Sequence, residues 1–211
     1  MKTTTTAVAV AVVTLFAAAS AARAEEQLLS LDPATTSVHF TVTATGHDVE
    51  GSFHVTSGAV RFDVATGVAS GEIRVDALSA VTGNGSRDKT LRGDVLEVER
   101  YPLFVFTPTH VAGALPAGGE GRVELRGVLA LHGASHPVTL TATVVREGDH
   151  LKLTSEFPVP YVEWGLHNPS VLFLKVADVV QVRIQGEGTL SPAAAATAAT
   201  TEPAVVSSHG G

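Results

Sequence analysis

The sequence predicts an all-β fold in which roughly eight to ten short strands close into a barrel. Apolar and polar residues alternate with a period of two along most of the chain, as in strands that bury one face. Turn-forming residues separate the alternating segments at short intervals. Glycine is abundant, with 20 residues, and Gly127 interrupts a long strand pattern, as glycine does where a strand bends at a barrel corner. A β-sandwich shares the first two features and remains the alternative architecture.

The first four expected strands lie in the N-terminal half of the chain. Residues 38–42 and 53–55 alternate valine or phenylalanine with polar residues. Residues 59–62 follow, and the aspartate and glycine of residues 63–67 predict a turn directly after them. Residues 73–75 then alternate again.

One stretch, residues 86–95, has a helical pattern instead. Ser86 can cap its start, and Leu91 and Val95 lie four positions apart, on one helical face. The sequence therefore predicts one or two short helices in a connection around residues 86–100. Because such a helix is shorter than the roughly 12–15 residues that an isolated helix needs, we expect it to dock on an apolar end of the barrel.

The remaining strands follow this connection. Each is a short apolar run or an alternating segment bounded by proline, glycine or a charged turn. They are residues 103–106, 123–131, 138–144, 151–153, 171–174 and 180–184.

The two ends of the chain differ from this pattern. Residues 1–24 have the layout of a secretory signal peptide, with Lys2 at the start and Ala22-Arg23-Ala24 as the cleavage pattern. The apolar run between them is shorter than the roughly 20 residues that span a membrane, although an uncleaved anchor is the alternative. We therefore expect cleavage near Ala24 and a periplasmic or secreted protein. Residues 191–211 are rich in alanine, threonine and proline and predict a disordered tail, which leaves residues 25–190 for the barrel domain.

The composition excludes several classes of function. The 211 residues include no cysteine, so neither a disulfide framework nor a thiolate metal site can form. There are 14 Lys and Arg against 21 Asp and Glu, a net charge of −7. Because binding to phosphate backbones needs clustered basic residues, we expect no nucleic-acid partner.

Several short motifs occur in order along the chain. They are Ser37-Val38-His39-Phe40, Val49-Glu50-Gly51-Ser52-Phe53, the segment from Arg87-Asp88 through Leu91-Arg92 to Tyr101-Pro102 and Phe106, and Gly127-Val128-Leu129 followed by Leu131-His132-Gly133. In order and spacing this set resembles the YceI-like family, and the likeness runs from about residue 31 to residue 190.

The resemblance implies both a fold and a function. Members of the family are lipocalin-like, with an eight-stranded antiparallel barrel that encloses an apolar tunnel. They are associated with binding polyisoprenoids, such as prenyl pyrophosphates or the tails of isoprenoid quinones. Many are periplasmic. We therefore expect a non-enzymatic carrier that sequesters an isoprenoid lipid.

Inward-facing apolar residues are the candidates for the tunnel lining. A hydrocarbon tail needs a dry wall of side chains without polar tips, and each buried CH₂ contributes about 0.8 kcal/mol. The candidates are Phe40, Val42, Phe53, Phe62, Ile73, Val75, Phe104, Phe106, Leu129, Leu140, Trp164 and Phe173. The alternative for each is ordinary core packing, since a barrel of this size can be filled by its own side chains.

Three basic residues beside the expected helix are candidates for a charged head group: Arg87, Lys89 and Arg92. Arginine is suited to bidentate contact with pyrophosphate. The alternative is a set of surface ion pairs with neighbouring acids. A neutral quinone head would not need these residues.

No motif predicts a catalytic centre, a metal site or a cofactor. Nucleophile-elbow and phosphate-loop patterns are absent, and the nine histidines lack metal-ligand spacing. Two alternatives to lipid carriage remain. One is an enzyme that acts on a lipid head group through His132, His136 or Glu163, and the other is a stress-related interaction module with a filled barrel. Beyond the isoprenoid lipid, a transient membrane contact and a homodimer are the partners that the sequence leaves open.

Overall fold

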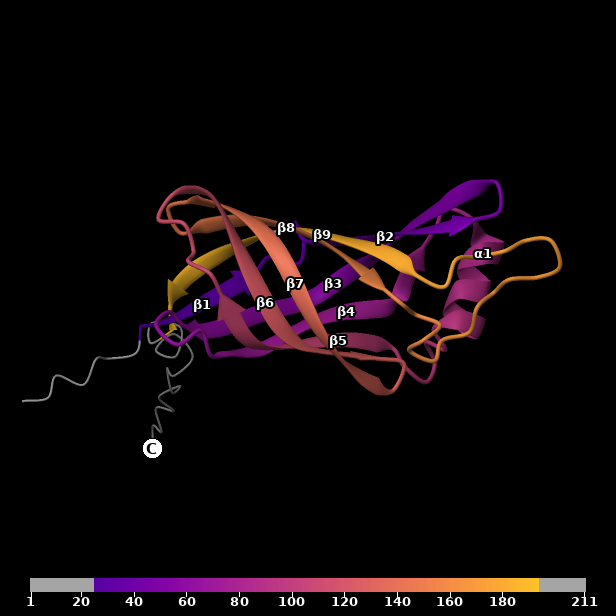
Figure 1. The fold of residues 1–211 in the computed structure, drawn as a ribbon, viewed down its shortest axis with the longest axis horizontal. Coiled ribbons are helices and arrows are strands. Elements are labelled where there is room, and N and C mark those ends of the chain that lie inside the picture. The colour runs from indigo at the N-terminus through magenta and orange to yellow at the C-terminus, as the bar shows by residue number, and fades with distance from the viewer. Residues whose placement is uncertain (1–24, 194–211) are drawn as a thin grey trace, which may run out of the picture.

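The strands of this protein form one closed antiparallel sheet (Figure 1). The computed structural model describes residues 25–193. In that range the strands are β1 (Glu26–Leu31), β2 (Ser37–Ala44), β3 (His47–Asp63), β4 (Ala69–Val81), β5 (Leu103–Ala112), β6 (Gly119–Leu131), β7 (Ala134–Glu147), β8 (His150–Val159) and β9 (Val180–Pro192). The prediction of an all-β fold is confirmed.

Two extra strand pairings close the sheet into a barrel. The hydrogen-bonded order is β1-β3-β2-β9-β8-β7-β6-β5-β4, and β4 also pairs with β3 while β1 pairs with β9. Strands β1 and β2 both lie between β3 and β9, at different levels: Leu28 faces Arg61 and Ser191, whereas Val38 faces Phe53 and Ile184. They share one position, so the barrel has eight positions, as predicted. A sandwich is excluded because the pairing of β4 with β3 closes the sheet on itself.

The helical connection covers one end of the barrel. It consists of α1 (Gly85–Thr90) and the π-helical turn η1 (Leu91–Val95), at the end opposite the start of β1 (Figure 1). Val95 and Leu96 are buried in a cluster with Phe104 and Tyr161. Docking on the barrel end is therefore confirmed. Within residues 25–193, no helix is long and apolar enough to cross a membrane.

The cap of this helix differs from the expectation. The side chain of Asn84, and not that of Ser86, accepts hydrogen bonds from the backbone N–H groups of Ser86 and Arg87, both at 3.1 Å. Asparagine and serine are both good capping residues, so the sequence pattern alone leaves the first turn free to start two positions earlier.

Three predicted strand boundaries are corrected. The segments 53–55 and 59–62 belong to the single strand β3, whose register against β4 shifts at two irregularities. Residues 171–174 form no strand of the barrel and make a tight turn instead. Strand β9 continues to Pro192, so the expected tail begins later than residue 191. The expected signal peptide, residues 1–24, and residues 194–211 lie outside the described residues.

Gly127 stands where bulky neighbours leave no room for a side chain. A Cβ atom there would lie 2.5 Å from the ring of Phe106 and from the carbonyl oxygen of Thr107. Gly127 pairs with Pro108, and the register of β5 against β6 shifts between Pro108 and His110. The strand irregularity predicted at this glycine is therefore present, and the glycine also makes space for an inward-facing phenylalanine.

Candidate ligand-binding cavity

The barrel encloses a cavity of about 300 Å³. This volume lies at the lower end of the roughly 300–1,000 Å³ typical of small-molecule sites. Its wall reaches from Leu151 and Val60, in the core cluster near β1, to Leu96 and Leu166, in the cluster beneath the helical connection. The cavity therefore extends along the barrel and suits an elongated ligand.

Strand alternation builds the wall. Even-numbered residues of β2, β7 and β9 and odd-numbered residues of β6 and β8 face the cavity, as the period of two requires. Three phenylalanine rings form a row across β2, β3 and β5. The rings of Phe40 and Phe53 lie 5.2 Å apart, and those of Phe53 and Phe104 lie 5.4 Å apart with an edge-to-face angle of 78°. Such contacts fix the rings and keep the wall apolar.

Polar groups are scarce in this wall. Among the described residues that line the cavity, none is charged or histidine, and only Thr36, Ser155 and Tyr161 carry a hydroxyl group. The Thr36 hydroxyl donates to the carbonyl oxygen of Asp32 at 2.7 Å, and the Ser155 hydroxyl donates to that of Thr141 at 2.9 Å. The protons of both hydroxyl groups are therefore engaged in hydrogen bonds within the wall.

Tyr161 is different. Its side chain is buried, and within residues 25–193 its hydroxyl group has no hydrogen-bond partner. Burial, together with the negative charge of Asp178, raises the pKa of Tyr161 to about 12. The hydroxyl is therefore protonated at neutral pH, but its oxygen atom is closed off from the cavity, and the ring of Tyr161 forms part of the wall.

Comparison with known proteins agrees with this architecture. The sequence model of the YceI-like domain matches residues 29–188. This protein belongs to the YceI-like family. A UPF0312 protein of Vibrio vulnificus strain YJ016 is 30% identical over 132 residues, which cover 61% of this chain and 67% of the relative.

Two solved structures share the fold of this YceI-like protein. BcnA of Burkholderia cenocepacia superposes with a TM-score of 0.62 at 23% identity, over 75% of this chain and 99% of BcnA. A polyisoprenoid binding domain from Saccharophagus degradans, implicated in plant cell wall breakdown, gives a TM-score of 0.59 at 16% identity, over 77% and 98% of the two chains.

Most of the predicted tunnel residues of this YceI-like protein lie in the cavity wall. They are Phe40, Val42, Phe53, Phe62, Ile73, Val75, Phe104, Phe106, Leu129 and Leu140. Their position facing the cavity follows from strand alternation, as expected. Their contact with a ligand stays a prediction.

Trp164 and Phe173 do not line the cavity, and their assignment is corrected. Trp164 stacks on the ring of His136, with 4.1 Å between centroids and an angle of 7°. Phe173 is 91% exposed, in the connection between β8 and β9. The backbone groups of Val171 and Leu174 hydrogen-bond to each other in both directions, so this apolar run turns back on itself instead of entering the barrel wall.

The three head-group candidates also lie outside the wall. Arg87 donates to the hydroxyl and the carbonyl oxygen of Thr82, each at 2.8 Å, and Arg92 reaches the carbonyl oxygen of Leu78 at 3.4 Å. Lys89 is exposed. The two arginines are therefore held by the end of β4 and its following turn, and the helical connection places apolar residues against the cavity.

The residues of the enzyme alternative do not line the cavity either. His132 lies beside the ring of Tyr101, and its Nε2 is 3.2 Å from Oε1 of Glu97. His136 contacts Trp164, and Glu163 is exposed. Within residues 25–193, no three His, Asp or Glu side chains gather in a group that could hold a metal ion.

Sequence reasoning missed part of the wall. The inward residues of β8 and β9, such as Leu151 and Val182, show the same alternation as the residues that were selected, so the signal was present. Tyr161 gave no such signal, because it lies in a turn after β8 that has no strand period.

Proposed function

We propose that this protein is a periplasmic carrier that sequesters the hydrocarbon chain of an isoprenoid lipid inside its barrel. The observation that carries the proposal is the elongated cavity of about 300 Å³ with an almost wholly apolar wall. One isoprene unit buried there contributes roughly 3–4 kcal/mol before ordering costs, so a few units suffice for tight binding. The shared fold with a polyisoprenoid binding domain supports the same ligand class.

A carrier must also load and release its lipid, and the connection between β8 and β9 offers a contact for a membrane. Its tip, residues 171–174, consists of Val171, Leu172, Phe173 and Leu174, which are 61%, 87%, 91% and 42% exposed. The tip protrudes beyond α1 (Figure 1). Pro169 and Val176, which flank it, line the cavity. An apolar surface that leads into an apolar cavity suits exchange with a bilayer.

The base of this connection is anchored to the barrel. The backbone N–H of Thr45, between β2 and β3, donates to the carbonyl oxygen of Lys175, and the N–H of Lys175 donates to the Thr45 hydroxyl, both at 2.9 Å. The N–H of Ala177 donates to the carbonyl oxygen of Thr43 at 2.8 Å. The tip is therefore presented on a fixed support, which favours insertion into a surface over collapse onto the barrel.

The filled-barrel alternative fits the structure less well, because the interior holds a cavity of about 300 Å³. For the enzyme alternative, no reactive group faces that cavity among the described residues, apart from hydroxyl groups.

Native mass spectrometry tests the proposal directly. Protein purified from the periplasm of its own host should carry bound lipid. Where several lipid species are bound, their masses should differ by whole isoprene units. Protein stripped of lipid should take up prenyl compounds again. Repeated recovery of protein that carries no lipid and binds no prenyl compound would overturn the proposal.

A further inference from the structure

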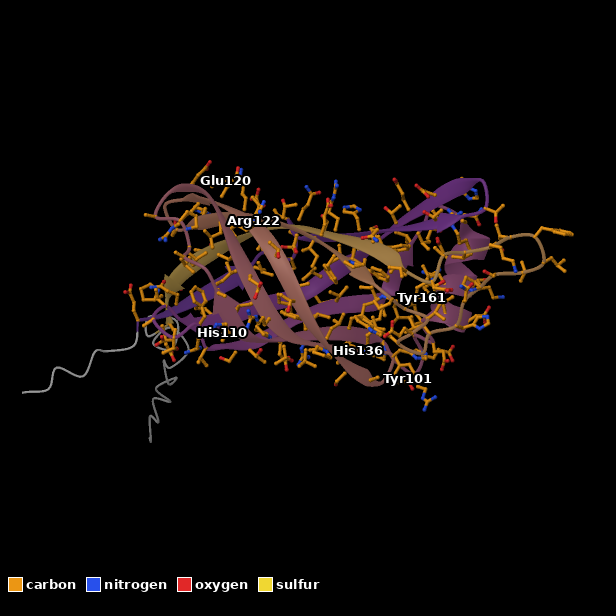
Figure 2. All side chains as sticks on the ribbon, viewed as in Figure 1. Tyr101, His110, Glu120, Arg122, His136 and Tyr161 are labelled. Atoms are coloured by element: carbon orange, nitrogen blue, oxygen red, sulfur yellow. The ribbon has the colours of Figure 1, made fainter. Side chains whose placement is uncertain are left out.

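Apolar side chains gather at the end of the cavity that lies opposite α1. Leu29 of β1 and Leu115, in the connection between β5 and β6, line the cavity and pack on the core cluster around Leu151. His110 and Glu120, on the two strands that this connection joins, lie near that end of the molecule (Figure 2). One side chain at this end of the cavity therefore comes from a connection and not from a strand.

The connection that carries Leu115 is fixed to the barrel. The guanidinium group of Arg146, on β7, donates to the carbonyl oxygen of Pro116 at 3.5 Å and to that of Gly148 at 2.8 Å. Pro116 also packs against Gly121 of β6, where a Cβ atom would lie 2.9 Å from the proline ring. Leu115 is therefore held in place by the residue that follows it.

The wall of the cavity offers no partner to a polar head group. Among the described residues that line it, none is charged. The hydroxyl groups of Thr36 and Ser155 donate to backbone carbonyl oxygens, and the oxygen of Tyr161 is closed off. Burial of a polar group without a hydrogen bond is unfavourable. The cavity therefore suits hydrocarbon alone, and a head group stays outside it.

The size of the cavity limits the length of hydrocarbon that it can hold. An apolar protein cavity of about 150 Å³ holds one benzene molecule, which has six carbon atoms. By the same measure, the cavity of about 300 Å³ has room for roughly twelve carbon atoms. This corresponds to roughly two to three isoprene units of five carbon atoms each. Further units of a longer chain remain in water.

We infer that the cavity selects a short isoprenoid chain, of about ten to fifteen carbon atoms, and that Leu115 sets this length. The inference rests on the proposed function, because it needs an isoprenoid chain in the cavity. It adds a limit on the substrate: units beyond the third, and the head group, contribute little to affinity.

Four probes separate chain length from head group. Geraniol, farnesol and geranylgeraniol share an alcohol head and have two, three and four isoprene units, and farnesyl diphosphate has the chain of farnesol with a charged head. Because each buried CH₂ changes affinity about fourfold, the wild type should bind farnesol at least about tenfold more tightly than geraniol. Geranylgeraniol and farnesyl diphosphate should both bind within about threefold of farnesol, because their additional groups stay in water. Native mass spectrometry of equimolar mixtures measures these ratios.

Substitution of Leu115 should shift the length limit in either direction. Leu115→Ala lengthens the cavity, so farnesol and geranylgeraniol should gain at least about tenfold in affinity relative to geraniol. Leu115→Phe shortens it and should reduce the preference for farnesol over geraniol. The matched control is Leu78→Ala, because Leu78 of β4 is 50% exposed and lies outside the cavity wall. It should keep the wild-type ratios.

Thermal unfolding shows which of the Leu115 variants fold, and one folded variant is enough for the test. The inference is overturned if a folded Leu115 variant keeps the wild-type ratios, or if wild-type affinity continues to rise from farnesol to geranylgeraniol. A clear preference for either farnesol or its diphosphate would also overturn it. In these cases the protein still binds isoprenoids and the carrier function stands. If the wild type binds none of the four probes, the carrier function fails, and the inference fails with it.

Discussion

At the scale of single residues, Asp88 shows how a charge can be buried for structural reasons. It is 8% exposed and accepts hydrogen bonds from the backbone N–H and the hydroxyl of Thr82. Thr82 in turn accepts from Arg87. The sequence made Arg87 a candidate to bind a charged head group, but its contacts with Thr82 instead fix α1 to the turn after β4. Residue identity alone could not separate the two roles, because both need an arginine beside a helix.

Asp88 should make the protein sensitive to acid. The hydrogen bonds from Thr82, with the charges of Arg92 and Arg87, lower the pKa of Asp88 from its ordinary value. A carboxyl group whose pKa is lower in the folded state stabilises that state above the unfolded pKa, and the contribution is lost as pH falls through the folded value. We therefore expect the free energy of unfolding to fall below about pH 4, and Asp88→Asn to reduce that dependence.

Denaturant unfolding at a series of pH values between neutrality and acid measures this effect. Asp94→Asn, at an exposed carboxylate nearby, is the matched control and should keep the wild-type slope. The same slope in Asp88→Asn and in the wild type would show that the contact with Thr82 has no influence on acid stability.

At the scale of elements, hydrophobic periodicity predicts secondary structure well wherever a segment has one solvent-exposed face and one buried face. It located most barrel strands and the helical connection. It failed for residues 171–174, because an exposed apolar turn and a buried strand share the same composition. It also missed β1, in which Leu28 and Leu29 are adjacent and do not alternate. It divided β3 where the register against β4 shifts between Val55 and Ser57.

The tip of residues 171–174 predicts membrane binding that polar substitutions remove. An apolar side chain that is fully buried contributes about 1.5–3 kcal/mol, so Leu172→Ser with Phe173→Ser should weaken partition into lipid vesicles at least about tenfold. Lipid transfer to vesicles should slow in proportion. Vesicle sedimentation and a fluorescent transfer assay measure the two effects.

Val64→Ser with Val68→Ser is the matched control for the tip. These residues are 56% and 62% exposed but lie at the turn between β3 and β4, near the start of β1. Their replacement should leave vesicle binding intact. If the tip variant binds vesicles normally but no longer self-associates, the tip is the contact of a homodimer and the membrane role is wrong.

At the scale of the whole molecule, the cavity is the property that the sequence could not supply. Alternation predicts which residues face inward, and the same inward residues could fill a barrel of this size. Whether a void remains depends on how side chains such as Phe40, Phe53 and Phe104 pack against one another across three strands. The family likeness, and not the pattern, carried the expectation of a tunnel.

Filling the cavity should weaken lipid binding without loss of the fold. Ala142 lines the cavity, whereas its neighbour Thr141 on β7 is exposed. We expect Ala142→Phe to weaken prenyl binding at least about tenfold, since the loss of room for two CH₂ groups already costs about 1.6 kcal/mol. Thr141→Phe, which adds the same bulk to the adjacent residue, should bind normally. Calorimetric titration gives the affinities, and thermal unfolding confirms that both variants fold.

The shared barrel position of β1 and β2 has a consequence for how the protein is made. Each of these strands needs β9 as a neighbour, and β9 ends at Pro192. Until that last strand has been synthesised, both early strands carry one row of unsatisfied backbone groups, the kind of edge that recruits other chains into aggregates. Ring closure across nearly the full chain is also slow. Biogenesis of this protein should therefore depend on holding chaperones that shield β1 and β2 until β9 has paired with them.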